Sequence, residues 1–371
     1  MDFNLSDRQV DLQEKARALL DNEFSANLMR EAEHSSEGFP RAIWNKGTEL
    51  GWPGMMVQEN SGGQGGSLLD ACMLLEEIGR AGATLPLVAS SGLSAAILQR
   101  SPKGTHRDQG LKDIAAGKII APALIDEQGR NEWDTVRLPL TADGNAYTLS
   151  GRKILVPFGS SADGLLVTAL TTDGETAIII IDPATQGISI VPHNSGAGVP
   201  MSSVEFDNVQ ISHDQLIVQG LDAGAALENG LHIGSLLATA EAIGLSETIK
   251  KLTTEYVSQR EAFGQPIGAF QAVAHPCADM HINAETIRLL VYQAAWLIDN
   301  GKDAIEEIAS TKALANELFE RGANDAFCFH GANGFAADFD VQLFMRRIRS
   351  FCATMGETHE SFERAAQAVG I

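Results

Sequence analysis

The sequence lacks the features that mark several broad classes of protein. No apolar run reaches the roughly 18 residues needed to cross a bilayer, so we expect no membrane span. The first six residues have neither the basic segment nor the apolar core of a secretory signal. Only four cysteines occur, and none form a C-x-x-C pair, so neither a zinc site nor a redox motif is indicated. We therefore expect a cytoplasmic protein whose cysteines are reduced and packed as small apolar groups.

Basic residues are also scarce. The chain has 27 Lys and Arg against 48 Asp and Glu, a net charge of −21. Nucleic acids and anionic membranes are bound by basic patches, so neither is expected as the main partner. No G-x-G-x-x-G motif follows a predicted strand, which argues against a Rossmann dinucleotide-binding domain. A nucleotide cofactor would have to be held by another route.

Three regions of different character follow one another along the 371 residues. Residues 1–118 show helical periodicity, and Ser6 and Gln9 have capping-box spacing at its start. Residues 119–220 contain short β-rich runs separated by Asp-Gly, Ser-Gly and Asp-Pro turns, which predict a small antiparallel β-barrel or sandwich. Residues 221–371 are helical again, with a stripe of small residues that favours a four-helix bundle. We expect an α+β protein with an N-terminal helical domain, a middle β-domain and a C-terminal bundle.

The stretch Arg260–Gln271 interrupts the helical pattern of the third region. It reads Arg-Glu-Ala-Phe-Gly-Gln-Pro-Ile-Gly-Ala-Phe-Gln, and its two glycines and its proline break helices. A basic residue that ends one helix and a glutamine that begins the next would form a compact polar corner. The residues alone fit a plain helix–helix connection equally well. The string resembles the R-x-x-F-G-x-x-I-x-x-F-Q signature of the acyl-CoA dehydrogenase superfamily.

A second match lies far from the first in the sequence. The glycine-rich Ser61–Gly66 is followed by a predicted helix that contains Glu-Glu-Ile-Gly-Arg, residues 76–80. This arrangement is similar to the N-terminal helical domain of the same superfamily. The order of helices, β-domain and helices is also what the resemblance implies, and the likeness covers nearly the whole chain.

The resemblance implies a cofactor, FAD, held between the helical domain, the β-domain and a neighbouring subunit. Arg260 would meet the FAD pyrophosphate, where a planar and permanent cation suits phosphate oxygens. The glycine-rich turn His330–Phe335 would let backbone amides approach the cofactor, although it could also be a simple interhelical bend. The residues that the resemblance assigns to the cofactor are Arg260, Phe263, Gln271, His330, Gly331 and Gly334.

The β-domain departs from the family pattern where it would close over the flavin. The family segment Thr-Glu-Pro-x-x-Gly-Ser-Asp corresponds here to residues 125–132, in which we see Glu127 and Gly129 as retained. A family Trp-x-Thr contact is replaced by Leu155-Val-Pro157. The flavin-ring contacts therefore differ from the usual ones.

The catalytic base is missing from both places where the family carries its glutamate. Dehydrogenation of an acyl thioester needs a carboxylate to take the α-proton. The match puts the two positions at Met355 and Gly234, and neither residue can accept a proton. Glu357 is the fallback candidate, while Glu241 is expected to face elsewhere on its helix. No metal site is predicted, because the histidines are too dispersed: His275, His281, His330 and His359.

Four hypotheses follow. In the leading one, the chain resembles the short, base-lacking subunit of dehydrogenases that act on steroid side-chain thioesters. Such a subunit pairs with a base-bearing partner in an α2β2 heterotetramer, and the assembly passes electrons to an acceptor. A second is a self-sufficient acyl-CoA dehydrogenase, as a homo-oligomer, with Glu357 or another carboxylate as base. A third is a flavin monooxygenase of the same fold, and a fourth is a cofactor-free scaffold.

Overall fold

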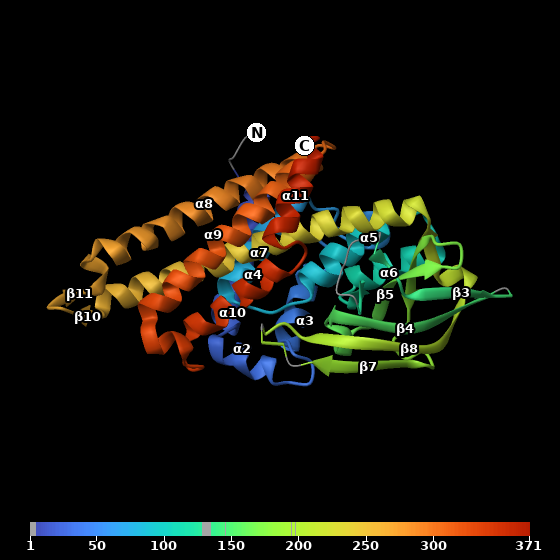
Figure 1. The fold of residues 1–371 in the computed structure, drawn as a ribbon, viewed down its shortest axis with the longest axis horizontal. Helices are drawn as coiled ribbons and strands as arrows, with labels where there is room; N and C mark the ends of the chain where they lie inside the picture. The colour runs from blue at the N-terminus through green and yellow to red at the C-terminus, as the bar shows by residue number, and fades with distance from the viewer. Residues whose placement is uncertain (1–4, 128–134, 145, 194, 197) are drawn as a thin grey trace.

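The computed structural model describes residues 5–127, 135–144, 146–193, 195–196 and 198–371. The molecule is elongated, with long helices at one end and a β-sheet at the other (Figure 1). No helix within these ranges is long and apolar enough to cross a membrane.

The N-terminal region is helical, as predicted. The side chain of Ser6 accepts a hydrogen bond from the Gln9 amide at 3.3 Å, and the side chain of Gln9 accepts one from the Ser6 amide at 3.0 Å, so the predicted capping box is confirmed. An eight-residue π-helix follows the fourth helix, and such segments are rare and often mark functional sites. The helical elements are α1 (Asp7–Glu23), α2 (Ala26–Glu33), α3 (Arg41–Glu49), η1 (Glu59–Ser61), α4 (Leu68–Ala81), η2 (Leu87–Ser94), α5 (Ala95–Arg100) and α6 (Thr105–Ala115).

The middle region forms one mixed sheet. Its strands are β1 (Ile120–Ala123), β2 (Ile125–Asp126), β3 (Pro139–Asp143), β4 (Ala146–Pro157), β5 (Gly164–Thr171), β6 (Thr176–Ile181), β7 (Ile188–His193), β8 (Met201–Ser212) and β9 (Leu216–Gln219). The order is β7-β8-β4-β3-β5-β6-β9, with β1 paired to β5 and β2 to β4. The end strands β7 and β9 pair with β8 and β6 but not with each other within the described part of the chain, so of the predicted barrel or sandwich no closed barrel forms.

The sheet also differs from the prediction in strand direction. β5 runs parallel to both β1 and β3, whereas an antiparallel barrel or sandwich was expected. Parallel neighbours need crossover connections, which hydrophobic alternation within single strands does not reveal. The sequence shows separate β-rich runs at Tyr147–Leu149 and Lys153–Val156, with Ser150-Gly151 between them, which predicts two strands. Both runs belong to one strand, β4, whose pairing with β8 contains two register shifts. These bulges bend the strand and interrupt its sequence pattern.

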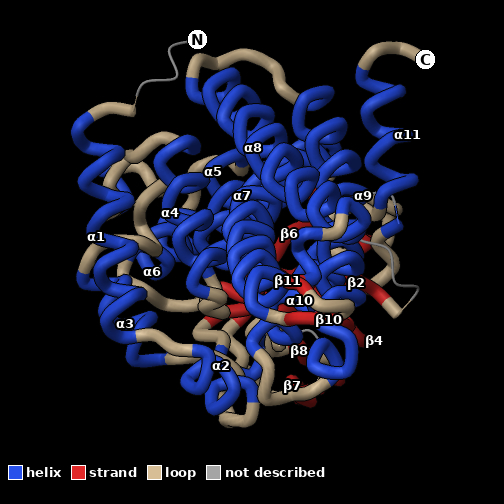
Figure 2. The backbone as a smooth tube through the Cα atoms, turned by 90° about the vertical axis from the view of Figure 1, so that its left-hand side faces the viewer, coloured by secondary structure: helices blue, strands red, loops and turns tan. Residues whose placement is uncertain are grey.

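The C-terminal region is a bundle of long helices that continue from the sheet. Its elements are α7 (Leu221–Gln259), β10 (Glu261–Ala262), β11 (Gln265–Pro266), η6 (Ile267–Ala269), α8 (Gln271–Asp299), α9 (Ile305–His330), η7 (Gly331–Phe335), α10 (Asp340–Ala353) and α11 (Thr358–Ala368). Helices α7, α8, α9 and α10 pack on one another, which confirms the predicted bundle, and Figure 2 views it along its length. A division into domains at 118/119 and 220/221 stays a prediction.

The stripe of small residues on α7 serves a contact outside the bundle as well. A Cβ added at Gly244 would lie 2.0 Å from the Glu76 carbonyl oxygen, and one added at Gly79 would lie 1.9 Å from the Glu241 carbonyl oxygen. Helices α4 and α7 therefore cross at backbone contact, which only glycine permits at these two positions. This crossing joins the N-terminal and C-terminal helices into one hydrophobic core.

Candidate functional site

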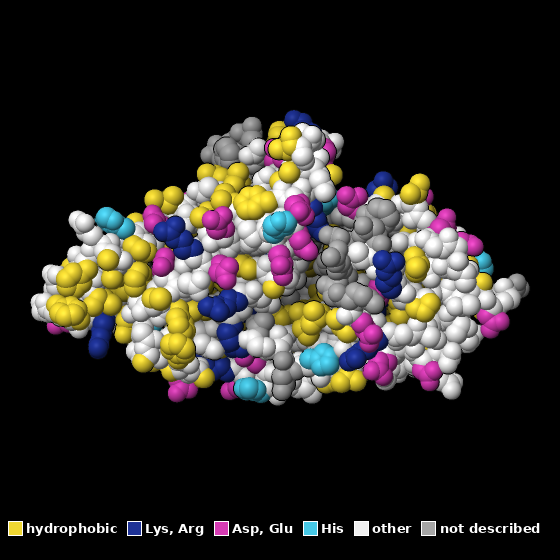
Figure 3. Space-filling model, in the orientation of Figure 1, with side chains coloured by type: hydrophobic (Ala, Val, Ile, Leu, Met, Phe, Trp, Pro, Cys, Tyr) yellow, Lys and Arg dark blue, Asp and Glu magenta, His cyan; other side chains and the backbone are white. Residues whose placement is uncertain are grey.

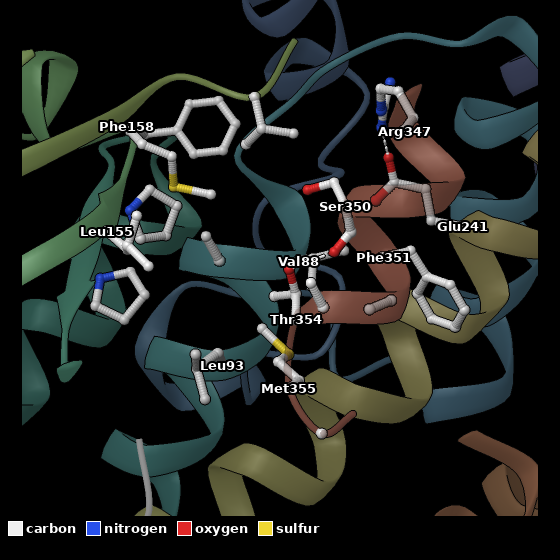
Figure 4. A pocket seen from close by; sticks show the side chains of 18 of the residues that line it. Val88, Leu93, Leu155, Phe158, Glu241, Arg347, Ser350, Phe351, Thr354 and Met355 are labelled. Atoms are coloured by element: carbon white, nitrogen blue, oxygen red, sulfur yellow. Dashed lines mark hydrogen bonds and ion pairs between the residues drawn. The ribbon is translucent and has the colours of Figure 1, made fainter. Parts of the chain in front are cut away.

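A cavity of about 280 Å³ lies where the three regions meet. Its walls include η2, the strands β1, β2, β4 and β8, the helices α7 and α10, and the segment between α10 and α11 (Figure 4). Most of the lining is apolar, and this includes Leu85, Val88, Leu93, Phe158, Val199 and Leu245. Figure 4 shows Leu155 and Phe158 on one side and Glu241, Arg347 and Phe351 on the other. A concave, mostly apolar cavity with a few polar groups is the usual form of a small-molecule site.

The backbone around this cavity is unusual. The described backbone contains five non-glycine residues with positive φ, and three of them line the cavity: Leu155 at 51°, Phe158 at 56° and Met355 at 56°. A fourth, Phe263 at 54°, lies in the Arg260–Gln271 corner. Bulky residues rarely adopt this conformation, and such strain clusters at functional sites. The strain points to the same two places that the sequence singled out.

The two positions expected to carry a base lie against each other. A Cβ added at Gly234 would be 2.9 Å from the sulfur of Met355, although the two residues are far apart in the sequence. Met355 lines the cavity. Glutamates from either position would therefore reach the same part of the cavity, and this chain has a carboxylate at neither.

The fallback residue Glu357 has a structural role. It is the N-cap of α11, and its side chain accepts a hydrogen bond from the amide of Glu360 in a capping box. It lines the cavity but is exposed. An exposed carboxylate at a helix end lies outside the enclosed part of the cavity, so it is poorly placed to take a proton from a bound acyl group.

Glu241 faces the cavity, so the expectation that it points elsewhere was wrong. Positions 234, 238, 241 and 245 fall on one face of α7, and the last three line the cavity. Glu241 forms an ion pair with Arg347. Burial raises the pKa of Glu241, and the Arg347 guanidinium opposes that rise. Helical periodicity places positions 238, 241 and 245 on one face, but the sequence of this helix does not show which face borders a cavity.

Arg347 is anchored on its other side. Its Nη1 donates to the carbonyl oxygen of Gly82 at 2.8 Å and to Oγ1 of Thr84 at 3.2 Å. The guanidinium is only 5% exposed. The ion pair with Glu241 is therefore a fixed feature of the buried end of the cavity.

A buried lysine holds the segment that carries Met355. Lys312 on α9 donates to Oδ1 of Asn316 at 2.6 Å and to the carbonyl oxygen of Phe351 at 3.0 Å. Asn316 in turn donates to the carbonyl oxygen of Gly356 at 3.1 Å. Burial lowers the pKa of Lys312 to about 7. These bonds fix residues 351–356 from behind, and sequence reasoning did not find them.

A second buried lysine supports the opposite wall. Lys153 lies 2.7 Å from Oδ1 of Asp126 and donates to the carbonyl oxygen of Leu124, a lining residue, at 3.0 Å. Burial lowers the pKa of Lys153 to about 8, and Asp126 opposes this shift. The family resemblance singles out Glu127, which is exposed, and Gly129, which lies outside the described residues. A charged residue within the β-rich run 153–156 was the available signal.

The Arg260–Gln271 corner lies far from this cavity. Arg260 caps the end of α7, Gln271 begins α8, and the β10–β11 hairpin connects them. Arg260 and Gln271 are exposed, and Phe263 is 96% exposed. Arg260 lies 19 residues beyond Glu241 on α7, which is about 28 Å along the helix. The corner therefore projects from the tip of the molecule (Figures 1 and 2).

The second predicted cofactor element lies at the same end of the bundle. His330 ends α9 and stacks on Tyr256 of α7 with ring centroids 4.4 Å apart. Its Nδ1 is 2.8 Å from the carbonyl oxygen of Ala326, so the ring is held in place. Gly331 has a φ of 56°, and Gly334 is buried against Phe327. The structure thus brings the His330–Gly334 turn next to the last turn of α7, which carries Arg260.

Exposed apolar side chains surround this end. Phe335 is 74% exposed, in addition to Phe263. Figure 3 shows apolar side chains gathered over the tip where β10 and β11 lie. Apolar surface next to an exposed arginine is typical of a region that contacts another molecule.

One cluster has ligand atoms close enough for a metal ion. Those of Glu247, His281 and Glu285 lie within 4.8 Å of one another. However, Lys250 contacts Glu247 and His281, and Arg288 contacts both glutamates. These cations already balance the carboxylates, so the cluster reads as a surface ion-pair network.

Comparison with known proteins identifies the family. The sequence matches the acyl-CoA dehydrogenase N-terminal domain over residues 6–118 and the acyl-CoA dehydrogenase C-terminal domain over residues 223–369. The chain belongs to the acyl-CoA dehydrogenase family. Its members are FAD-dependent oxidoreductases that act on CH–CH groups, and the resemblance inferred from the Arg260 corner is confirmed.

Individual relatives are distant but match over nearly their whole length. The chain is 27% identical to the probable acyl-CoA dehydrogenase YngJ of Bacillus subtilis, covering 93% of both chains. Among solved structures, it is 25% identical to a chain of the ChsE4-ChsE5 complex from Mycobacterium tuberculosis, with a TM-score of 0.89 and coverage of 100% and 99%. Butyryl-CoA dehydrogenase from Megasphaera elsdenii shares the fold, with a TM-score of 0.91, 23% identity and 100% coverage of both chains.

Proposed function

We propose that this chain is one subunit of a heteromeric flavin-dependent acyl-CoA dehydrogenase, which helps to bind FAD while a homologous partner supplies the catalytic glutamate. The reaction would be α,β-dehydrogenation of an acyl-CoA thioester. The observation that carries the proposal is the contact between Gly234 and Met355. Both family positions for the base meet at one place, and neither offers a carboxylate.

The cofactor-binding part of the proposal concerns the tip of the bundle. The residues that would hold FAD are Arg260, Phe263, Gln271, His330, Gly331 and Gly334. Arg260 is exposed, with a guanidinium that can bind diphosphate oxygens in a bidentate manner. Because this tip is about 28 Å from the chain's own cavity, the residues fit an FAD bound mainly by a neighbouring subunit. FAD, when bound, accepts the hydride that leaves Cβ of the substrate.

The heteromeric part of the proposal draws support from one relative. The ChsE4-ChsE5 complex, whose name gives two different chains, covers this chain completely. In an α2β2 assembly, a base-bearing homologue would supply the catalytic carboxylate, and the exposed Arg260 corner of this chain would contribute to FAD binding. The acyl group would then be of the steroid side-chain type, and an electron-transfer protein would reoxidise the flavin.

One observation favours a second candidate, a self-sufficient dehydrogenase. Glu241 lines the cavity and is largely buried, which suits a general base better than the exposed Glu357 does. Its ion pair with Arg347 and its place two helical turns from Gly234 argue against this role. Replacement of Glu241 by Gln, with measurement of α-proton exchange in the isolated chain, separates the two candidates.

The deciding experiment is co-expression with a glutamate-bearing homologue. We expect the isolated chain to carry little flavin and no dehydrogenase activity. The co-purified complex should carry flavin, and Arg260→Met in this chain should lower the flavin content of the complex. Full flavin loading and activity of the isolated chain would overturn the proposal.

A further inference from the structure

The cavity has two chemically different ends. Its mouth is marked by exposed residues, namely Leu155 at 50% exposure together with Glu357 and Glu360. Its inner end is marked by the Glu241–Arg347 ion pair, whose side chains are 16% and 5% exposed. Between these ends the walls are mostly apolar. A molecule that fills the cavity must therefore place some group against a buried ion pair.

We propose that the cavity binds an acyl thioester whose distal end carries a hydroxyl group, which donates to Glu241 and accepts from Arg347. The inference rests on the proposed function for the acyl thioester and goes beyond it by naming the distal group. A hydroxyl is both a donor and an acceptor, so one group can satisfy a carboxylate and a guanidinium together.

Other distal groups fit the ion pair less well. A methyl end would displace water from both charges and could not replace the hydrogen bonds that this water makes. A carboxylate end would be repelled by Glu241, and an ammonium end by Arg347. A keto end could accept from Arg347 but would offer no donor to Glu241. The hydroxyl is the neutral group that matches both partners.

The geometry of α7 sets the length of the ligand. Gly234, where the reacting carbons would lie, and Glu241 are seven residues apart, which is about 10.5 Å along the helix. Ala238 lies between them on the same face and leaves room for an apolar body. An acyl group of medium length would span this distance. Since neither Gly234 nor Met355 is a base, the bound thioester keeps its α-proton in this chain.

The test compares the binding of two thioesters by titration calorimetry. Octanoyl-CoA and 8-hydroxyoctanoyl-CoA are titrated into the isolated chain and into its complex with the partner. We expect the hydroxylated thioester to bind about tenfold tighter, because a site that hydrogen-bonds a hydroxyl rejects the analogue that lacks it. Glu241→Met with Arg347→Met, which keeps the side-chain volume but removes the charges, should abolish or reverse this preference.

A neighbouring ion pair provides the matched control. Arg346, next to Arg347 on α10, pairs with Glu33 at 2.9 Å, and neither residue lines the cavity. Glu33→Gln with Arg346→Gln should leave the preference unchanged. Arg347 also holds Gly82 and Thr84, so a second variant guards against loss of folding in the double Met protein. Glu241→Gln puts a neutral amide in place of the carboxylate and should reduce the preference.

Each outcome is decisive. Equal binding of the two thioesters by the unaltered chain, or tighter binding of octanoyl-CoA, overturns the inference while the proposed function stands. A preference that persists in the folded Glu241 variants also overturns it. Failure to bind either thioester overturns the inference. If the complex also takes up no flavin, the proposed function fails with it.

Discussion

Replacement of Met355 by Glu should give the cavity the base that it lacks. Met355 lines the cavity, and its sulfur lies where a Cβ at Gly234 would point. Glutamate and methionine have similar length, and the residue at position 355 already lines the cavity. A carboxylate in this partly buried place would have a raised pKa, which brings it closer to the working pH of a general base.

The size of the effect follows from general base catalysis. A positioned base contributes about 10² to 10⁴ in rate, which corresponds to roughly 3 to 5 kcal/mol of activation free energy. The assay is the exchange of α-protons for deuterium in an acyl-CoA incubated with the flavin-loaded complex in D2O, followed by mass spectrometry. The partner's own glutamate is replaced by Gln, so that only position 355 can act. Met355→Gln has the same shape without the base and is the matched control.

A double variant extends the same test. Gly234→Glu alone would place its Cβ 2.9 Å from the Met355 sulfur, so the flexible Met side chain would have to move. Gly234→Glu with Met355→Gly removes this obstacle and should restore exchange to a similar level. The reasoning is refuted if Met355→Glu folds and binds the thioester, yet exchanges α-protons no faster than Met355→Gln.

Three further predictions concern the tip, the buried lysine and the helix crossing. Arg260→Met should weaken flavin binding by the complex roughly tenfold to a hundredfold in a fluorescence titration, because a charge-assisted contact is lost; unchanged affinity would show that the corner is only a turn. The pKa of Lys312 is about 7 in the folded state, against 10.5 for a lysine in water, so the unfolded chain binds more protons between these values and stability rises with pH across that window. When the pH falls from 9 to 7, the free energy of unfolding of Lys312→Met should therefore rise by about 2 kcal/mol relative to that of the unaltered chain, as measured by urea unfolding. A difference between the two proteins that does not change with pH would contradict the assigned pKa. Gly79→Ala should cost roughly 3 kcal/mol in the same assay because its Cβ would lie 1.9 Å from a carbonyl oxygen of α7, whereas Gly104→Ala, with no atom nearby, should cost little.

The helices were predictable because the hydrophobic periodicity and the helix-capping and helix-breaking residues indicate the same boundaries. The capping-box spacing of Ser6 and Gln9 predicted the start of α1, and the helix-breaking residues after Arg260 predicted the end of α7. The sheet was less predictable. The parallel pairing of β1 and β3 with β5 depends on contacts between distant segments, and the bulges in β4 split one strand into two apparent runs.

The candidate site shows the same contrast. Motif comparison singled out Arg260 and the two base positions, and the contact between Gly234 and Met355 agrees with their assignment to one place. It turned Glu241 away from the cavity and missed Lys312 and Lys153, because the roles of these residues come from burial rather than from a local pattern. Single charged residues in apolar surroundings were the only hint that the sequence offered.

The most direct test of the proposed subunit role is the flavin content and activity of this chain with and without its partner. Flavin absorbance per chain and acyl-CoA dehydrogenation are measured on the isolated protein and on the complex with a glutamate-bearing homologue. We predict little flavin and no turnover for the isolated chain. The complex should contain flavin and dehydrogenate the acyl-CoA. Stoichiometric flavin with full activity in the isolated chain would contradict the proposal that its base resides on another polypeptide.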